Sequence, residues 1–308
     1  METGEIHLSL YDPTHKLSAM PPIQNITIIV NRSKPGAERL AERIQNLAAE
    51  LKRKVTTIHE FPVPNGALSN ADLCCVIGGD GTILGIVEAA SSNKVPVLGI
   101  NLGRLGFMVH YNAAEIERIL PDILDGNYRT EKRTLIRCSD NDGHTCLALN
   151  DLVVRSNGSR LVPLEISADG EVVNQYYADG VIFSTPTGST AYNLSAGGPI
   201  VHPKASVLLV TPINPHTLSN RSIVLDGQVE ITVAADDSDS GNIRVSADGR
   251  EAFGGEAAFP INLQIDPEHH FELILPRAFS HYNLLRNKLS WAGDAPSRQK
   301  NTPNELST

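Results

Sequence analysis

The chain has 308 residues, of which 41% are hydrophobic and 20% are charged, and it carries a formal net charge of −9. This length allows two domains that each bury a core of their own, and the composition is typical of a soluble globular protein. Non-specific binding to nucleic acid or to anionic membranes needs positive potential, and no apolar run approaches the roughly 18–20 residues that cross a bilayer. We therefore expect neither nucleic acid nor a membrane as a partner.

The N-terminus and the cysteines indicate a cytoplasmic protein. Residues Met1–Pro22 lack the cationic and then apolar pattern of a secretory signal, and we expect a flexible lead there. Cys74 and Cys75 lie inside an apolar run and are expected to be buried thiols. Cys138 and Cys146 flank a predicted hairpin tip and could pair geometrically, but without a secretory signal we expect reduced thiols.

The first third of the chain alternates strand and helix signals. Residues 26–30 form a continuous apolar run, which is typical of a strand buried on both faces. Apolar residues then recur at helical spacing from Ala37 to Leu51. Further strands are predicted at 55–58, 73–77 and 95–100, and further helices at 83–90 and 113–120. The alternation predicts an α/β domain with a parallel sheet over residues 23–125, in which ligands bind at the carboxyl ends of the strands.

After about Gly126 the pattern changes to short strands separated by turn signals. Asp169-Gly170 between two of them predicts a two-residue hairpin. The predicted strands are 134–138, 146–155, 164–168, 171–175, 181–184, 206–211, 229–234, 243–246, 261–265 and 271–275. They favour an all-β, sandwich-like domain over residues 126–280, followed by a C-terminal tail, 281–308, that packs back or is disordered. The acidic residues 236–239 lack a full set of calcium ligands, so we interpret them as a hairpin tip.

Residues 78–82 read Gly-Gly-Asp-Gly-Thr and lie where a predicted strand turns into a helix. Glycines permit positive φ and a close approach to the backbone, and the N-terminus of the following helix favours an anion such as phosphate. A carboxylate in such a loop suits work on a hydroxyl group or on a metal beside phosphates, so Asp80 indicates kinase chemistry. The alternative is a tight turn in which Asp80 caps the helix. No Gly-x-x-x-x-Gly-Lys-Ser/Thr motif occurs, which excludes a P-loop enzyme.

Two polar motifs follow other predicted strands or apolar runs. Asn101–Phe107 reads Asn-Leu-Gly-Arg-Leu-Gly-Phe, which is either a glycine-rich crossover or a loop whose Arg104 reaches a phosphate. Asn150-Asp151 follows the apolar residues 147–149. Such a pair can hold two vicinal ribose hydroxyls, because the carboxylate accepts hydrogen bonds while the amide both donates and accepts. A turn is the alternative, but the flanking apolar residues do not suit a turn at the surface.

The longest motif, Asp179–Pro199, combines a strand, a hydroxyl-rich turn and the start of a short helix. Its many small hydroxyl groups and Tyr192 suit recognition of a neutral, hydrogen-bonding ring system: the aromatic ring stacks on the ligand and the hydroxyls read its edges. A serine- and threonine-rich loop in a β-domain has the same composition and is the alternative.

These four motifs, in this order and spacing, resemble the NAD kinase family over roughly residues 25–278. The resemblance implies an α/β domain followed by a β-sandwich, assembled as a homodimer or homotetramer. It also implies phosphorylation of the adenosine-ribose 2′-hydroxyl of NAD to give NADP, with ATP as the phosphoryl donor and Mg²⁺ or another divalent cation as cofactor. Asp80 matches the family's catalytic acid, taken as the base for the ribose hydroxyl.

The resemblance further implies the residues that bind the substrates. The loop beside the phosphates comprises Gly78, Gly79, Gly81 and Thr82. The residues implied in NAD binding are Asp80, Gly81, Asn150, Asp151, Asp179, Thr187, Thr190, Ala191, Tyr192, Asn193, Leu194, Ser195 and Arg250. Asp179 and Ala191 match contacts near the nicotinamide end, and Tyr192 matches the adenine-stacking aromatic residue. Arg250 stands where relatives often have Gln, and no residue of this chain is assigned as a metal ligand.

Two other functions are open at this point. Diacylglycerol kinases and phosphofructokinases look similar at the first motif, so a lipid or sugar-phosphate kinase is the alternative among enzymes; the fourth motif separates them from this chain. A non-catalytic NAD(P) sensor is the alternative from another class, and the intact Asp80 argues against it.

Overall fold

The structure, a computed structural model, describes residues 20–64, 66–103, 105–158, 161–217, 219–236, 241–254 and 257–291. The described residues divide into two compact units, one ending at residue 277 and one beginning at residue 278. In the second unit, helix α7 (His281–Lys288) starts after Ser280, whose hydroxyl oxygen accepts the N–H of Asn283. Among the described residues, no helix combines the length and the apolar character that a membrane crossing needs.

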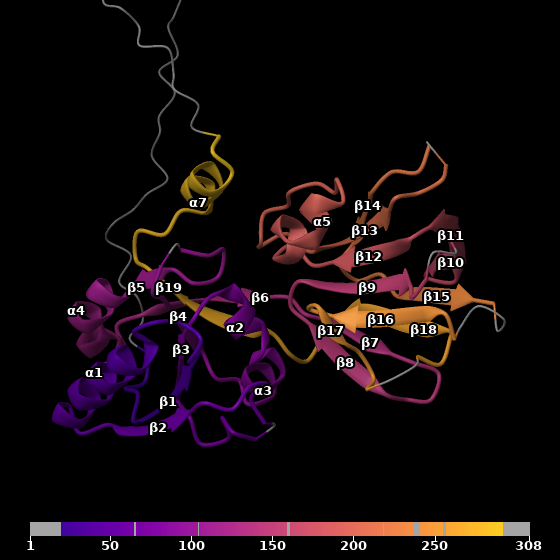
Figure 1. Ribbon diagram of the computed structural model, residues 1–308. Coiled ribbons are helices and arrows are strands. Elements are labelled where there is room, and N and C mark those ends of the chain that lie inside the picture. Colours follow the sequence, from indigo (N-terminus) through magenta and orange to yellow (C-terminus); the bar gives the residue numbers. More distant parts are fainter. Residues whose placement is uncertain are drawn as a thin grey trace, which may run out of the picture. The chain divides into compact units, whose positions relative to one another are not determined.

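The first unit contains a seven-stranded sheet in the order β2-β1-β3-β4-β19-β6, with β5 beside β4 (Figure 1). All neighbouring strands in it are parallel except β19 and β6. The strands are β1 (Asn25–Val30), β2 (Lys54–Ile58), β3 (Leu73–Ile77), β4 (Val97–Asn101), β5 (Tyr111–Asn112), β6 (Arg129–Arg133) and β19 (Phe271–Leu275). Strands β6 and β19 come from the range expected for the second domain, so the chain returns to this sheet near its end.

Helices α1 (Ala37–Glu50) and α4 (Ala113–Leu124) share one hydrophobic core with β1, β3 and β4. Helix α1 contributes an apolar stripe that includes Leu40 and Ile44, as its helical spacing predicts. Helix α4 starts with a capping box: Asn112 accepts the backbone N–H of Glu115, and the Glu115 carboxylate accepts that of Asn112.

The β-rich part consists of two six-stranded antiparallel sheets (Figure 1). One has the order β11-β10-β15-β18-β7-β8, and the other has the order β14-β13-β12-β9-β16-β17. The strands of the former are β7 (Ile136–Ser139), β8 (Thr145–Ala148), β10 (Val162–Ala168), β11 (Glu171–Ala178), β15 (Ile231–Ala235) and β18 (Ile261–Ile265). Those of the latter are β9 (Asp151–Ser156), β12 (Gly180–Ser184), β13 (Val207–Ile213), β14 (Ile223–Asp226), β16 (Ile243–Ala247) and β17 (Arg250–Glu251).

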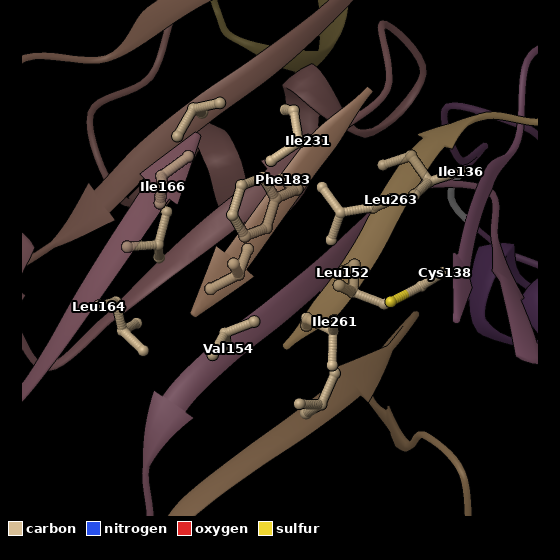
Figure 2. Packing of buried hydrophobic residues seen from close by; sticks show 14 of the residues in the cluster. Ile136, Cys138, Leu152, Val154, Leu164, Ile166, Phe183, Ile231, Ile261 and Leu263 are labelled. Carbon is tan, nitrogen blue, oxygen red and sulfur yellow. The ribbon is translucent and has the colours of Figure 1, made fainter. Parts of the chain in front are cut away.

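Side chains from both of these sheets meet in a second hydrophobic core (Figure 2). Leu152, Val154 and Phe183 come from one sheet, while Ile166 and Ile231 come from the other. Successive residues of a strand point to opposite faces, so Asp151 and Val153 lie on the face of β9 that turns away from this core. The predicted α/β part followed by a β-sandwich is confirmed.

The segment after β3 differs from the expectation of one helix over 83–90. The structure has two short helices there, α2 (Asp80–Leu84) and α3 (Val87–Ser92). Between them lies Gly85, and the ring of Phe61 packs so closely on it that a Cβ at position 85 would overlap the ring. Glycine disfavours a continuous helix, and this contact explains why it occupies the break.

Several other expectations can be compared with the described residues. The hairpin at Asp169-Gly170 joins β10 to β11, and both residues have positive φ, so this prediction is confirmed. Cys138 and Cys146 are free thiols that face each other on β7 and β8. Met20, within the expected flexible lead, donates its N–H to the carbonyl of Gly126 at 3.1 Å. Residues 1–19, Arg104, residues 237–240 and residues 292–308 lie outside the described part, so the expectations for them stay predictions.

Candidate active site

The carboxylate of Asp80 is held by a loop from elsewhere in the first sheet. Asp80 is the first residue of α2, directly after the turn that follows β3. Its Oδ2 accepts the backbone N–H of Phe107 at 2.8 Å, and its Oδ1 accepts those of Met108 at 3.0 Å and Val109 at 3.2 Å. An ionised carboxylate has about four acceptor sites, so three are used and one, on Oδ2, is left.

The loop can approach Asp80 this closely only because residue 106 is glycine. A Cβ at Gly106 would overlap both oxygen atoms of the Asp80 carboxylate. The glycines of the Asn101–Phe107 motif are thus explained in part by the carboxylate of the first motif. The two motifs, 27 residues apart in sequence, form one structural feature.

The turn itself differs from two expectations. Gly79 rather than Asp80 occupies the N-cap position, and it makes no side-chain cap, so the interpretation of Asp80 as a helix cap is wrong. None of Gly78, Gly79 and Gly81 has positive φ. A Cβ at Gly78 would overlap Thr82, whose hydroxyl accepts a hydrogen bond from Asn31 at the end of β1, 3.0 Å away. Close packing, and not a left-handed backbone, explains this glycine.

A cavity of about 620 Å³ lies along strands β9 and β16 of the β-sandwich and reaches Leu84, the last residue of helix α2 in the α/β part. This volume suits a small-molecule ligand. Four residues predicted to bind NAD line it: Asn150, Asp151, Ala191 and Tyr192. Its other lining residues are Leu84, Val153, Arg155, Arg244, Val245, Ser246, Asp248, Gly249 and Glu251.

Two buried carboxyl groups lie side by side in the wall of this cavity. Asp248 accepts the backbone N–H groups of Leu149 at 2.8 Å, Asn150 at 2.7 Å and Asp151 at 3.3 Å. Burial raises the pKa of Asp248 above its ordinary value. Burial, and then the charge of Asp248, raise the pKa of Asp151 to about 7, while a backbone hydrogen bond from Tyr192 opposes the shift. The cavity therefore contains a carboxyl group that titrates near neutral pH.

The hydroxyl-rich segment folds against the Asn150-Asp151 motif. Thr185 donates its N–H to the carbonyl of Asn150 at 2.9 Å and its hydroxyl to the carbonyl of Leu149 at 2.6 Å. The segment continues as a 3-10 turn, η1 (Gly188–Thr190), and a short helix, α5 (Tyr192–Ser195). These contacts bring two sequence motifs into the same cavity wall, in which Tyr192 is 41% exposed.

Arg250 connects this wall to helix α2. Its Nη2 donates a hydrogen bond to the carbonyl of Leu84 at 2.9 Å. Leu84 is the last residue of the helix that Asp80 starts, so the hydrogen bond links the β-sandwich to the helix that carries the candidate catalytic residue.

Comparisons with known proteins identify relatives of this chain. A family model described as the ATP-NAD kinase N-terminal domain matches residues 63–128, and one described as the ATP-NAD kinase C-terminal domain matches residues 149–260. The NAD kinase of Pseudomonas putida (strain GB-1) is 40% identical over 232 residues, which cover 74% of this chain and 78% of the relative. The chain belongs to the NAD kinase family.

Other members of the NAD kinase family are similar to this chain in sequence or in structure. The NAD kinase of Hydrogenovibrio crunogenus is 38% identical over 229 residues, covering 73% of this chain and 78% of the relative. A crystal structure of yeast NADH kinase complexed with NADH matches with a TM-score of 0.75 at 27% identity, covering 93% of this chain and 91% of that one. An NAD kinase from Archaeoglobus fulgidus in complex with ATP matches with a TM-score of 0.71 at 25% identity, covering 88% and 100%.

The remaining residues predicted for an NAD kinase site lie outside the lining of this cavity. Asp179 is exposed and its Oδ2 accepts a hydrogen bond from Asn214 at 2.9 Å. The hydroxyl oxygen of Thr187 is buried and has no hydrogen-bond partner among the described residues. The rest of the set outside the lining is Asp80, Gly81, Thr190, Asn193, Leu194, Ser195 and Arg250, together with Gly78, Gly79 and Thr82 of the phosphate loop.

Asn193 has a structural role in this segment. It is fully buried, its Nδ2 donates to the carbonyls of Ser189 and Pro199, and its Oδ1 accepts the hydroxyl of Thr211 at 2.7 Å. Since these bonds engage the side-chain amide within the protein, its predicted contact with NAD stays a prediction.

Several polar residues at the site were not predicted from the sequence, among them Arg155, Arg244 and Asn31. Arg155 lies four residues after Asp151 on the same strand, so the two-residue period of a strand could have placed both on one face. Arg244 lies opposite Arg155 on β16. Asn31 directly follows β1, and its Nδ2 donates a hydrogen bond to the hydroxyl of Thr82. Only the pairing of β9 with β16, which are far apart in sequence, identifies Arg244.

A group of three side chains with metal-ligating atoms occurs at the tip of the β7–β8 hairpin, formed by Asp140, Asp142 and His144. None of the three lines the cavity. Asp140 already accepts the N–H groups of Asp142 and His144, as expected for a tight turn. Near the cavity, Asp80 accepts three backbone N–H donors.

Proposed function

We propose that this member of the NAD kinase family transfers the γ-phosphoryl group of Mg²⁺-bound ATP to the adenosine-ribose 2′-hydroxyl of NAD, giving NADP and ADP. One observation carries the proposal. A carboxylate fixed by three backbone N–H groups starts the same helix whose last residue, Leu84, lines a cavity with two buried carboxyl groups and an exposed tyrosine ring.

Asp80 is the proposed base. Its remaining acceptor site would receive the 2′-hydroxyl, orient it, and take its proton as the oxygen forms a bond to the γ-phosphorus. The bond between that phosphorus and the β–γ bridging oxygen breaks, and ADP leaves. A carboxylate is a weak base for an alcohol, so positioning of the two substrates supplies most of the acceleration.

The other residues are proposed to bind rather than to react. Asn150 and Asp151 would hold the ribose hydroxyls, and the ring of Tyr192 would stack on adenine. Backbone N–H groups of residues 78–82 would stabilise the phosphates that meet the hydroxyl. The yeast relative was solved with NADH and the archaeal relative with ATP, which supports a dinucleotide acceptor and ATP as the donor.

The direct test is incubation of the purified chain with NAD, ATP and Mg²⁺, followed by detection of NADP and ADP in equal amounts. Assays with diacylglycerol or fructose 6-phosphate in place of NAD test the lipid and sugar-phosphate alternatives. If NAD binds but no NADP forms with any nucleoside triphosphate, the chain is a sensor and the proposed activity is wrong. Omission of Mg²⁺, or its replacement by Mn²⁺, tests the metal dependence.

We also propose that the chain works in the cytoplasm as a homodimer or homotetramer, with no nucleic-acid or membrane partner. The resemblance to the family and the net charge of −9 support this proposal. Light scattering on the purified chain measures the oligomeric state, and a monomer at micromolar concentration would contradict it.

A further inference from the structure

Two arginines lie side by side on the wall of the nucleotide cavity. Strands β12, β9 and β16 are neighbours (Figure 1), and their register places Gly180, Arg155 and Arg244 in one row across the sheet. Arg155 and Arg244 both line the cavity. Like charges directly opposite each other on neighbouring strands destabilise a sheet, so this pair calls for a compensating group.

The protein compensates one of the two charges. The Nη1 of Arg244 lies 2.5 Å from Oε1 of Glu251, and its Nε donates to Oδ1 of Asn157 at 2.8 Å. Arg155 makes no hydrogen bond or ion pair with any described residue, and it is exposed. The wall therefore presents one guanidinium that is held in place and, beside it, one whose charge has no partner among these residues.

The space beside Arg155 is kept free of side chains. A Cβ at Gly180 would lie 2.7 Å from Cβ of Arg155 and 2.5 Å from the carbonyl oxygen of Val154. Any residue larger than glycine at position 180 would therefore clash. As a result, the two guanidinium groups face the cavity without a third side chain beside them. Guanidinium groups bind phosphate oxygens through their planar fork of N–H donors.

The position of the pair within the cavity identifies the anion. Arg155 lies four residues, or about 13 Å, along β9 from Asp151 and on the same face. In the proposed function, on which this step rests, Asp151 holds the adenosine ribose of NAD. The charged group attached to that ribose is the pyrophosphate bridge of the dinucleotide.

We infer that Arg155 and Arg244 bind the pyrophosphate of NAD and so make the cavity selective for a dinucleotide over adenosine. Arg155 supplies the free charge, and Arg244, oriented by Glu251 and Asn157, supplies a second set of donors from a fixed position. Neither residue touches the reacting hydroxyl in this arrangement, so both determine affinity and not the chemical step.

Calorimetric titration of Arg155→Gln and Arg244→Gln tests the inference with three probes: NAD, adenosine, and a non-hydrolysable ATP analogue with Mg²⁺. We expect NAD affinity to fall about tenfold to a hundredfold in Arg155→Gln, and adenosine affinity to stay unchanged. The NAD dissociation constant of the unaltered chain should also rise with salt more steeply than that of Arg155→Gln. Arg155→Lys keeps the positive charge but loses the planar fork of N–H donors, so its NAD affinity should lie between that of the unaltered chain and that of Arg155→Gln.

Arg221→Gln is the matched control, because Arg221 is an exposed arginine outside the cavity lining. Equal loss of NAD and adenosine affinity, or loss confined to the ATP analogue, would overturn the assignment to the dinucleotide pyrophosphate. So would an unchanged NAD affinity in Arg155→Gln. If one of these results is obtained and the unaltered chain still converts NAD to NADP, only the inference fails. If the unaltered chain neither binds nor converts NAD, the proposed function fails as well.

Discussion

Asp80 and Asp151 are proposed to serve one nucleotide site, yet their carboxyl groups lie in opposite environments. Asp80 is partly exposed and accepts three backbone N–H groups. Asp151 is 5% exposed and lies beside Asp248, and burial together with the charge of Asp248 raises its pKa to about 7. Asp80 is thus a carboxylate held in one orientation, whereas Asp151 is a carboxyl group that changes charge near neutral pH. The former suits alignment of a reacting hydroxyl, and the latter suits binding.

The largest expected effect separates these two roles directly. Asp80→Asn should lower kcat by about 10²- to 10⁴-fold, the usual range for loss of a general base, while the NAD dissociation constant stays nearly constant. Asp151→Asn should mainly weaken NAD binding. Steady-state kinetics together with NAD titration of both variants measure this difference. A near-normal kcat in Asp80→Asn would remove its proposed role.

The second prediction moves the Asp80 carboxylate without changing it. Gly106→Ala places a methyl group on the Asp80 oxygen atoms, so the loop or the carboxylate must shift. We expect kcat to fall up to about a hundredfold, since misplacement by about 1 Å can have an effect of that size. Gly103→Ala is the matched control, because a Cβ there meets nothing within 4 Å. Equal activities of the two variants would show that the orientation of Asp80 is unimportant.

The third prediction concerns pH and stability. The folded-state pKa of Asp151 lies above its ordinary value, so its contribution to stability is fully present below about pH 4 and is lost as the pH rises through about 7. Between pH 5 and pH 8 this loss amounts to about 2–3 kcal/mol of the free energy of unfolding. Urea unfolding at both pH values should show it in the unaltered chain and not in Asp151→Asn. The same pH dependence in both would contradict the assignment.

The fourth prediction concerns the exposed ring in the cavity. Stacking of a base on an aromatic side chain contributes about 1–3 kcal/mol, so Tyr192→Ala should weaken NAD binding at least severalfold with little change in kcat. Tyr192→Phe keeps the ring and should bind NAD almost normally. Fluorescence or calorimetric titration measures the affinity, and an unchanged dissociation constant in Tyr192→Ala would show that the ring does not contact the ligand.

The smallest expected effect concerns the hydrogen bond between the β-sandwich and helix α2. Arg250→Ala removes the donor to the Leu84 carbonyl and should lower the free energy of unfolding by about 1 kcal/mol. Urea unfolding at neutral pH measures this change, with Arg221→Ala as an exposed control. A loss of NAD affinity without a loss of stability would instead indicate that Arg250 acts through the ligand.

Much of the fold was predictable because its signals are local. The helical spacing of apolar residues from Ala37 to Leu51 and the Asp169-Gly170 turn each predict an element from neighbouring residues alone, and both elements exist. The break between α2 and α3 was not predictable, because it depends on Phe61, which approaches Gly85 from a distant part of the sequence. The return of β19 to the first sheet is likewise a long-range pairing, which a strand pattern does not specify.

The sequence by itself determined the change from alternating strands and helices to a β-rich pattern, the identity of the motifs and the membership in the NAD kinase family. Local periodicity and a recognisable arrangement of glycines and acids suffice for these. Only the tertiary structure decided what surrounds each carboxyl group: three N–H donors from residues 107–109 around Asp80, and Asp248 beside Asp151. It also decided that Arg155 faces Arg244. Burial and hydrogen bonding arise from segments far apart in the chain, so no local pattern of residues contains them.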